Sequence, residues 1–297
     1  MPSLEDGTPW RGIDAEACYR YALSRQSPTG GFCYYNYSPW GVEDANAPDT
    51  HAAIAIFQLL CRPVPNVERC VDWLRSLQDS AGAYPTLLIA HAALKALRLL
   101  GAAPTRNPSL FIQDAARAAG ATASNRHDLR SWLANAALCS DLWLDFPIIL
   151  ADEMRHSIGA TRRRLRHESD GYGWPGPDLV QTWMAVSLGD ALGVPTEMQT
   201  LDFVQRCQGP PLGFNITPDA VSSSLDCQLA GVRLGARFGA RLADPTSTRT
   251  YVARCQTAAG GFGRAPGAIP RLGDSWKALD ILVSLDAVAS PSITTGG

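Results

Sequence analysis

Four ionisable side chains are the strongest candidates for acid–base chemistry: Asp49, His51, Asp178 and Lys277. Asp49 and His51 could form an acid pair, because a neighbouring carboxylate raises the pKa of a histidine and burial raises that of a carboxyl group. Lys277 lies in an apolar stretch and could bind a carboxylate or phosphate, or act as a base if desolvated. The structural alternative is that Asp49 and Asp178 cap helices and that His51 is a buried histidine with its hydrogen bonds satisfied.

Aromatic and acidic residues recur near these positions and are candidates for substrate binding. Aromatic faces attract cations, so a cavity walled by them can stabilise a carbocation. The candidates are Tyr34, Tyr35, Trp40, Trp174, Trp183, Asp226, Asp274 and Trp276. The structural alternative is that the aromatic residues fill gaps between repeated units and that Asp274 caps a helix.

Motifs for common cofactor and nucleophile chemistry are missing. The Walker loop, HExxH and GxSxG are absent from the sequence, so we expect no cofactor and no metal site. The eight cysteines are scattered and form no CxxC pair, and we expect them to behave as small core residues.

The elements that must position the candidates come from a repeated pattern. A helical stretch ends in a polar turn, often with Gln; a Gly-aromatic element, a loop with Pro or Asp, and a second, apolar helix follow. The clearest copies begin at Gln208 and Gln256, and similar ones begin at Gln26, Gln78 and Gly171. Gly allows a turn with positive φ after the first helix, and Asp, Ser or Thr caps the second.

The two helices of each copy differ in polarity. Second helices, such as residues 52–57 and 183–186, are apolar nearly all round, which is typical of helices buried on every side, whereas first helices such as 67–74 are amphipathic. This predicts an all-α fold, a single domain over residues 1–297 in which five or six helical hairpins form an α/α toroid. The expected repeats are approximately 14–60, 66–101, 108–145, 148–193, 197–239 and 247–290.

The pattern resembles the prenyltransferase/squalene-oxidase repeat over residues 14–290, most closely in residues 255–267. The superfamily that it resembles includes protein prenyltransferase β subunits and terpene cyclases. The resemblance implies a funnel-shaped central cavity, lined by inner-helix N-termini and aromatic residues, that holds an isoprenoid. Because one fold can carry many functions, the site must be considered separately.

The resemblance to protein prenyltransferases implies a zinc site that this sequence does not reproduce. That branch has Asp-x-Cys at the start of one inner helix and His on the next. Here Asp226 and Cys227 are adjacent, Lys277 stands where the His is expected, and no histidine follows His167. The family's diphosphate-binding Arg and Lys precede Asp-x-Cys, but residues 214–219 contain no basic residue. Zinc-dependent prenyl transfer is therefore the weakest alternative.

The resemblance to cyclases implies an Asp-x-Asp-Asp-Thr motif whose middle Asp is a protonated general acid. Residues 46–50 match only its end, at Asp49, and Pro48 stands at the place of the acid. The Asp-Asp-x-x-Asp motif of ionisation-type cyclases is also missing. Asp141 and Asp145 are four residues apart, but we expect them in an outer region of the fold.

The leading hypothesis is a bacterial terpene cyclase-like enzyme that acts on an isoprenoid or similarly hydrophobic substrate. The reaction would be an acid/base-assisted cyclisation or rearrangement in an aromatic-lined cavity, with Asp49, His51 or Asp178 as the acid. The alternative is a non-catalytic toroid that binds a lipid or a partner protein, which the loss of both motifs favours. An enzyme predicts at least two ionisable groups facing one cavity, whereas a binding protein predicts an open apolar groove.

Composition limits the partners further. The net charge of −2 gives no field that would attract nucleic acid. No apolar run reaches the roughly 18 residues of a membrane span, and the first residues do not resemble a signal peptide, so we expect a soluble, cytoplasmic protein. A homodimer or a helical partner subunit stays open. Basic charge is carried almost wholly by Arg, which suggests a bacterial source.

Overall fold

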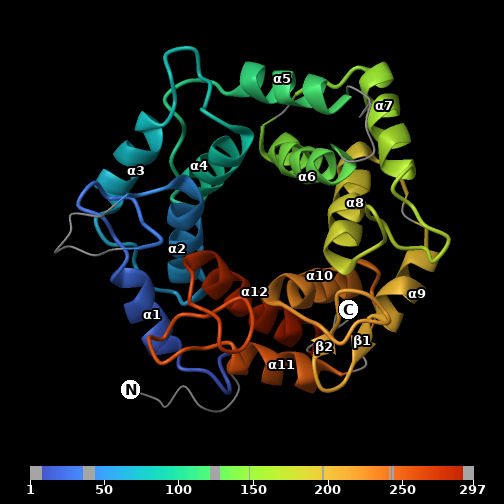
Figure 1. The fold of residues 1–297 in the computed structure, drawn as a ribbon. Coiled ribbons are helices and arrows are strands. Elements are labelled where there is room, and N and C mark those ends of the chain that lie inside the picture. Colours follow the sequence, from blue (N-terminus) through green and yellow to red (C-terminus); the bar gives the residue numbers. More distant parts are fainter. Residues whose placement is uncertain are drawn as a thin grey trace, which may run out of the picture.

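The computed structural model describes residues 9–35, 44–120, 128–146, 148–195, 197–240, 242 and 244–289. These residues form two concentric rings of helices (Figure 1). The outer ring consists of α1 (Ala15–Leu23), α3 (Val67–Ser76), α5 (Ser109–Gly120), α7 (Asp152–Arg163), α9 (Gln199–Arg206) and α11 (Pro245–Arg254). The inner ring consists of α2 (Ala47–Leu59), α4 (Leu87–Leu99), α6 (Leu129–Asp145), α8 (Leu179–Leu192), α10 (Leu225–Arg237) and α12 (Leu272–Ala289).

The inner ring is closed. Each inner helix contacts the next one along the chain, and α12 returns to contact α2. In the described part of the chain, the two-residue strands β1 (Gln208–Gly209) and β2 (Gly213–Phe214) form the sole sheet, an antiparallel hairpin between α9 and α10. The prediction of an all-α toroid is therefore confirmed.

A glutamine at the end of the outer helix joins neighbouring pairs. The side-chain amide of Gln26 donates to the carbonyl of Gly30 in its own loop (3.1 Å) and to that of Pro65 before the next outer helix (2.7 Å). Gly30 has φ 98°, and a Cβ there would overlap the backbone of α3. Glycine is therefore required both by the turn and by the close approach of the neighbouring pair.

A second recurring bond attaches the Gly-aromatic loop to the inner helix. The Thr50 hydroxyl accepts the N–H of Phe32 (2.8 Å), and Thr182 accepts that of Tyr172 (2.9 Å). Equivalent bonds join Phe214 to Gln228 and Phe262 to Ser275. All four aromatic rings are buried, so these copies share one register between loop and inner helix. No helix among the described residues is both long and apolar enough to cross a bilayer.

Candidate functional site

The first turns of three inner helices gather charged residues around one cavity of about 300 Å³. We call this end of the ring the mouth. Its lining comes from α2, α10, α12 and the loop before α12, and consists of Asp49, Asp226, Arg264, Arg271, Gly273, Asp274 and Lys277. The structure therefore brings together four of the predicted site residues, Asp49, Asp226, Asp274 and Lys277.

Lys277 lies between two carboxylates of the mouth. Its Nζ is 2.6 Å from Oδ1 of Asp226 and 3.5 Å from Oδ1 of Asp274, and Arg264 Nε lies 3.1 Å from the other oxygen of Asp226. The Cys227 thiol instead contacts the Ser224 hydroxyl at 3.4 Å. These residues do not fit a zinc ion, because an ammonium group occupies the place next to the carboxylate. Across the described residues, no three potential metal ligands are grouped.

Asp49 and Asp274 occupy the same position in their helices, one residue before the buried hydroxyl of Thr50 or Ser275. Asp49 does not cap α2, since that role belongs to Asn46, whose side-chain amide donates to Asp49 Oδ2 (2.7 Å). Burial raises the pKa of Asp49, opposed by the Asn46 hydrogen bond. Burial also raises the pKa of Asp274, opposed by the charge of Lys277. Both carboxyl groups are thus shifted toward the neutral form.

Asp178 has the structural role that the sequence left open. Its Oδ1 accepts the N–H of Gln181 (2.7 Å) as the N-cap of α8, and its Oδ2 accepts from the Gln181 side chain (2.6 Å). Both oxygens are therefore engaged within the first turn of the helix.

One turn into the inner helices, three predicted site residues and a fourth residue, His91, lie at one level of the ring that we call the waist. His51, His91, Trp183 and Trp276 each follow the buried position by one residue in α2, α4, α8 and α12. The His51 ring lies 5.5 Å from Trp276 and 6.4 Å from His91, centroid to centroid. Burial, with the nearby His91 and Lys95, lowers the pKa of His51 to about 4. The carboxylate that opposes this shift is Asp141, and not the Asp49 of the expected acid pair.

Asp141 and Asp145 are in the inner ring, so the expectation of an outer region was wrong. Asp141 accepts from His91 Nε2 (2.7 Å) and pairs with Lys95 Nζ (2.9 Å), while Asp145 pairs with Lys95 (2.8 Å) and with Arg98. Burial raises the pKa of Asp141, but the hydrogen bonds to His91 and Lys95 and their charges outweigh this effect and lower the pKa to about 2. The sequence between α5 and α6 contains no Gly-aromatic element, and this absence hid the inner position of α6.

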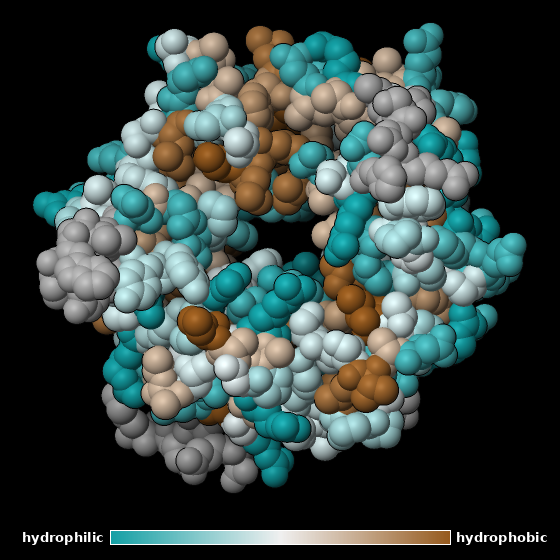
Figure 2. Space-filling model, in the orientation of Figure 1, coloured by the Kyte–Doolittle hydropathy of each residue, from teal (hydrophilic) through white to brown (hydrophobic). Residues whose placement is uncertain are grey.

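Arg233 of α10 lies between the two tryptophans of the waist. Its guanidinium is 5.8 Å from the Trp183 ring and 6.0 Å from the Trp276 ring, and it pairs with Asp280 of α12. Outer helices cover the other side of the inner ring, so the partly exposed side chains of this level face the central opening seen in Figure 2. The wall is therefore more polar than the aromatic lining that we expected.

The remaining predicted binding residues are dispersed. Tyr34 and Tyr35 are 39% and 53% exposed, and the Arg271 guanidinium lies 5.4 Å from the Tyr34 ring. Trp174 is half-buried in the loop before α8, where its backbone N–H donates to Gln181 Oε1 (3.1 Å). Trp40 lies outside the described residues.

Sequence reasoning missed six residues around the opening and assigned a seventh, Asp141, to an outer position. The six are His91, Lys95, Arg233, Arg264, Arg271 and Asp280. Three of them could have been found by counting residues from the N-cap of each inner helix. This count places His91 at the same level as His51, and Lys95 and Arg233 one turn further along their helices.

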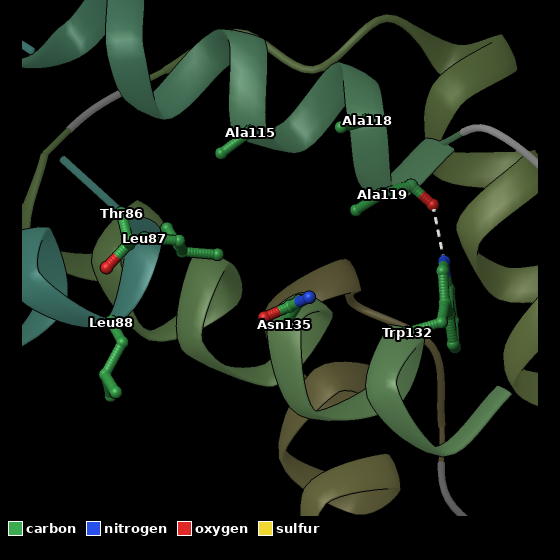
Figure 3. A pocket seen from close by; sticks show the side chains of 8 residues that line it. All are labelled: Thr86, Leu87, Leu88, Ala115, Ala118, Ala119, Trp132 and Asn135. Atoms are coloured by element: carbon green, nitrogen blue, oxygen red, sulfur yellow. Dashed lines mark hydrogen bonds between the residues drawn. The ribbon is translucent and has the colours of Figure 1, made fainter. Parts of the chain in front are cut away.

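A separate pocket of about 420 Å³ lies between α4, α5 and α6 (Figure 3). Its lining is Thr86, Leu87, Leu88, Ala115, Ala118, Ala119, Trp132 and Asn135. The Trp132 indole N–H donates to the Ala119 carbonyl (2.8 Å). Since no lining residue is ionisable, this pocket offers no acid or base.

Comparison with known proteins agrees with this geometry. The description "Prenyltransferase alpha-alpha toroid domain" matches residues 5–98 and 106–295. The protein geranylgeranyltransferase-I of Candida albicans, complexed with GGPP, has a similar fold, with a TM-score of 0.70 and 13% identity over 93% of this chain and 92% of that one. A variant of the type II terpene cyclase MstE from Scytonema, in complex with its product merosterolic acid A, gives a TM-score of 0.53 and 13% identity over 93% and 96% of the two chains. A search of curated protein sequences found no match. The family match covers most of the chain, which therefore belongs to the prenyltransferase α/α toroid domain family.

Proposed function

We propose that the protein is a terpene cyclase-like enzyme, which holds an isoprenoid or similarly hydrophobic substrate in the ring and protonates it from the mouth. The observation that carries this proposal is a pair of carboxyl groups, Asp49 and Asp274, that line one cavity and whose pKa values are raised by burial. A carboxyl group held neutral is the acid that protonation of an alkene or epoxide requires.

Asp49 is the better acid of the two. The largest effect that lowers its pKa is the hydrogen bond from the neutral amide of Asn46, ahead of the charges of Arg25 and Arg271, whereas Asp274 lies 3.5 Å from the ammonium of Lys277. A neighbouring cation favours the charged carboxylate. Asp274 and Lys277 would therefore set the charge of the mouth, while Asp49 donates the proton.

The waist supplies the groups that a carbocation would meet next. Trp183 and Trp276 offer aromatic faces, and the charge of the Arg233 guanidinium beside them is balanced by Asp280. His51, whose pKa is lowered to about 4, is neutral at physiological pH. A neutral imidazole can accept a proton, so His51 is assigned as a base and no longer as a candidate acid. Two of the solved structures of similar fold hold GGPP and a terpenoid product, which supports a hydrophobic substrate for this ring.

The test is product analysis by mass spectrometry after incubation with farnesyl diphosphate, geranylgeranyl diphosphate and squalene. We expect a product with the wild type and a loss of at least about a hundredfold with Asp49→Asn, the usual size of a general-acid contribution. Asp244→Asn is the matched control, because Asp244 caps the outer helix α11 and Asn is an equally good cap. Wild-type turnover by Asp49→Asn would remove the assigned acid, and absence of product from all three would exclude these substrate classes.

A further inference from the structure

The wall of the opening changes its chemistry with depth. At the waist, the equivalent positions of five inner helices are His51, His91, Trp183, Leu229 and Trp276. Four residues deeper, at a level that we call the floor, they are Ala55, Lys95, Ser187, Arg233 and Asp280. Residues four apart on a helix share a face, so both levels face the opening. An aromatic and imidazole level is thus followed by a charged one.

The charges of the floor are paired across neighbouring helices. Lys95 of α4 pairs with Asp141 of α6 (2.9 Å), and Arg233 of α10 pairs with Asp280 of α12. The side chains of Lys95 and Asp280 retain 19% exposure, so their polar atoms reach the opening. Asp145 also pairs with Lys95 and with Arg98, so three cations and three anions cancel and leave a floor that is neutral but rich in donors and acceptors. A hydrocarbon chain placed against it would desolvate these groups without replacing their hydrogen bonds.

The Ser187 hydroxyl is buried and has no hydrogen-bond partner among the described residues. At the waist, the His51 ring packs against the rings of Trp276 and His91. The polar groups that a ligand can meet at the floor are therefore those of the ion pairs.

The apolar band between mouth and floor is short. On α12 alone, Asp274 marks the mouth, Trp276 the waist and Asp280 the floor. At a rise of about 1.5 Å per residue, the floor lies about 9 Å beyond the mouth along the helix. A long polyprenyl chain would therefore extend past the tryptophans and lie against ion pairs.

We propose, on the basis of the function proposed above, that the substrate is a short molecule with a polar group at each end. Its reacting end lies at the mouth, its hydrophobic middle lies against the rings of Trp276 and His51, and an uncharged oxygen function, a hydroxyl or carbonyl group, binds the floor at Arg233 and Asp280. Oxygenated terpenoids of small size fit this class best, and a polyprenyl chain fits less well the longer it is.

The experiment compares two probes by titration calorimetry: octanol, and the octanediol with a hydroxyl at each end. A purely apolar cavity prefers octanol, because the second hydroxyl must be desolvated. We expect the wild type to bind the diol about tenfold more tightly, since hydrogen bonds to charged groups are the stronger ones. The double variant Arg233→Met/Asp280→Leu should lose this preference. Replacing a buried ion pair by apolar residues of similar volume is usually tolerated.

The matched control is Arg62→Met/Glu16→Leu, which removes a pair between the outer helix α1 and the loop after α2 (2.8 Å). We expect it to keep the wild-type preference. Asp280→Asn is the smaller change should the double variant not fold, and it should weaken diol binding about fivefold while leaving octanol unaffected. Equal or tighter binding of octanol by the wild type, or an undiminished preference for the diol in the floor variants, would overturn the proposal. Because binding needs no proton transfer, an inactive enzyme that still prefers the diol would count against the proposed cyclase chemistry alone.

Discussion

His51 should make the stability of this protein depend on pH between neutrality and about pH 4. Burial lowers its pKa from an ordinary 6.5 to about 4, so the folded state holds the neutral imidazole while the unfolded chain binds a proton. The stabilisation is therefore complete above pH 6.5 and is lost as the pH falls toward the folded value. The difference between the two pKa values, at about 1.4 kcal/mol for each pH unit, amounts to about 3 kcal/mol. Asp141, whose pKa is lowered from 3.8 to about 2, loses its contribution only at lower pH.

The variant that tests this reasoning is His51→Phe, which keeps an aromatic ring against Trp276. Urea unfolding, followed by circular dichroism at a series of pH values, gives the free energy of unfolding. Between neutrality and about pH 4 the wild type should lose about 3 kcal/mol more than His51→Phe. His156→Gln is the control, because His156 is exposed on α7, and it should follow the wild type. If His51→Phe and the wild type lost stability in parallel, the burial of a neutral His51 would be refuted.

Three further predictions concern the repeat and the mouth. Thr182→Val removes the hydroxyl that accepts a buried loop N–H and should cost about 1–3 kcal/mol; an unchanged urea midpoint would contradict this. Gly231→Ala places a Cβ within the ring of Phe214, so overpacking should lower stability by about 1–3 kcal/mol, and a thermal melt coinciding with that of the wild type would exclude the clash. Lys277→Met removes the ammonium that opposes the raised pKa of Asp274. That pKa should rise further, which an NMR titration of the Asp274 carboxyl group would measure; an unchanged pKa would show that the two groups are not coupled.

The toroid could be predicted because its markers are local. A glycine with positive φ, such as Gly260 (φ 91°), and a buried aromatic such as Phe262 recur at the ends of helices whose polarity alternates. Each marker acts within a few residues, through a turn, a cap or a hydrogen bond to the following helix. Repetition then makes the ring the natural way to bury every apolar inner helix.

The charges of the opening could not be predicted in the same way, because each pair joins different repeats. Lys95 and Asp141 are 46 residues apart, and their contact depends on the relative register of α4 and α6. Arg264 reaches Asp226 from a loop that its motif marks only as Gly-aromatic. Lys277 was singled out as a lysine in an apolar helix, but its partners Asp226 and Asp274 become visible only once the ring is closed.

The glutamine bond between neighbouring pairs also joins the last pair to the first. Gln256 donates to the carbonyl of Asp14 (2.7 Å) and accepts that residue's N–H (2.8 Å), as Gln26 donates to Pro65. In an open solenoid the outermost units have a single neighbour and fray first. Here every helical hairpin has two neighbours, so unfolding of any one hairpin removes two interfaces and interrupts the ring. Because no unit is terminal, we expect the whole ring to unfold in one cooperative transition.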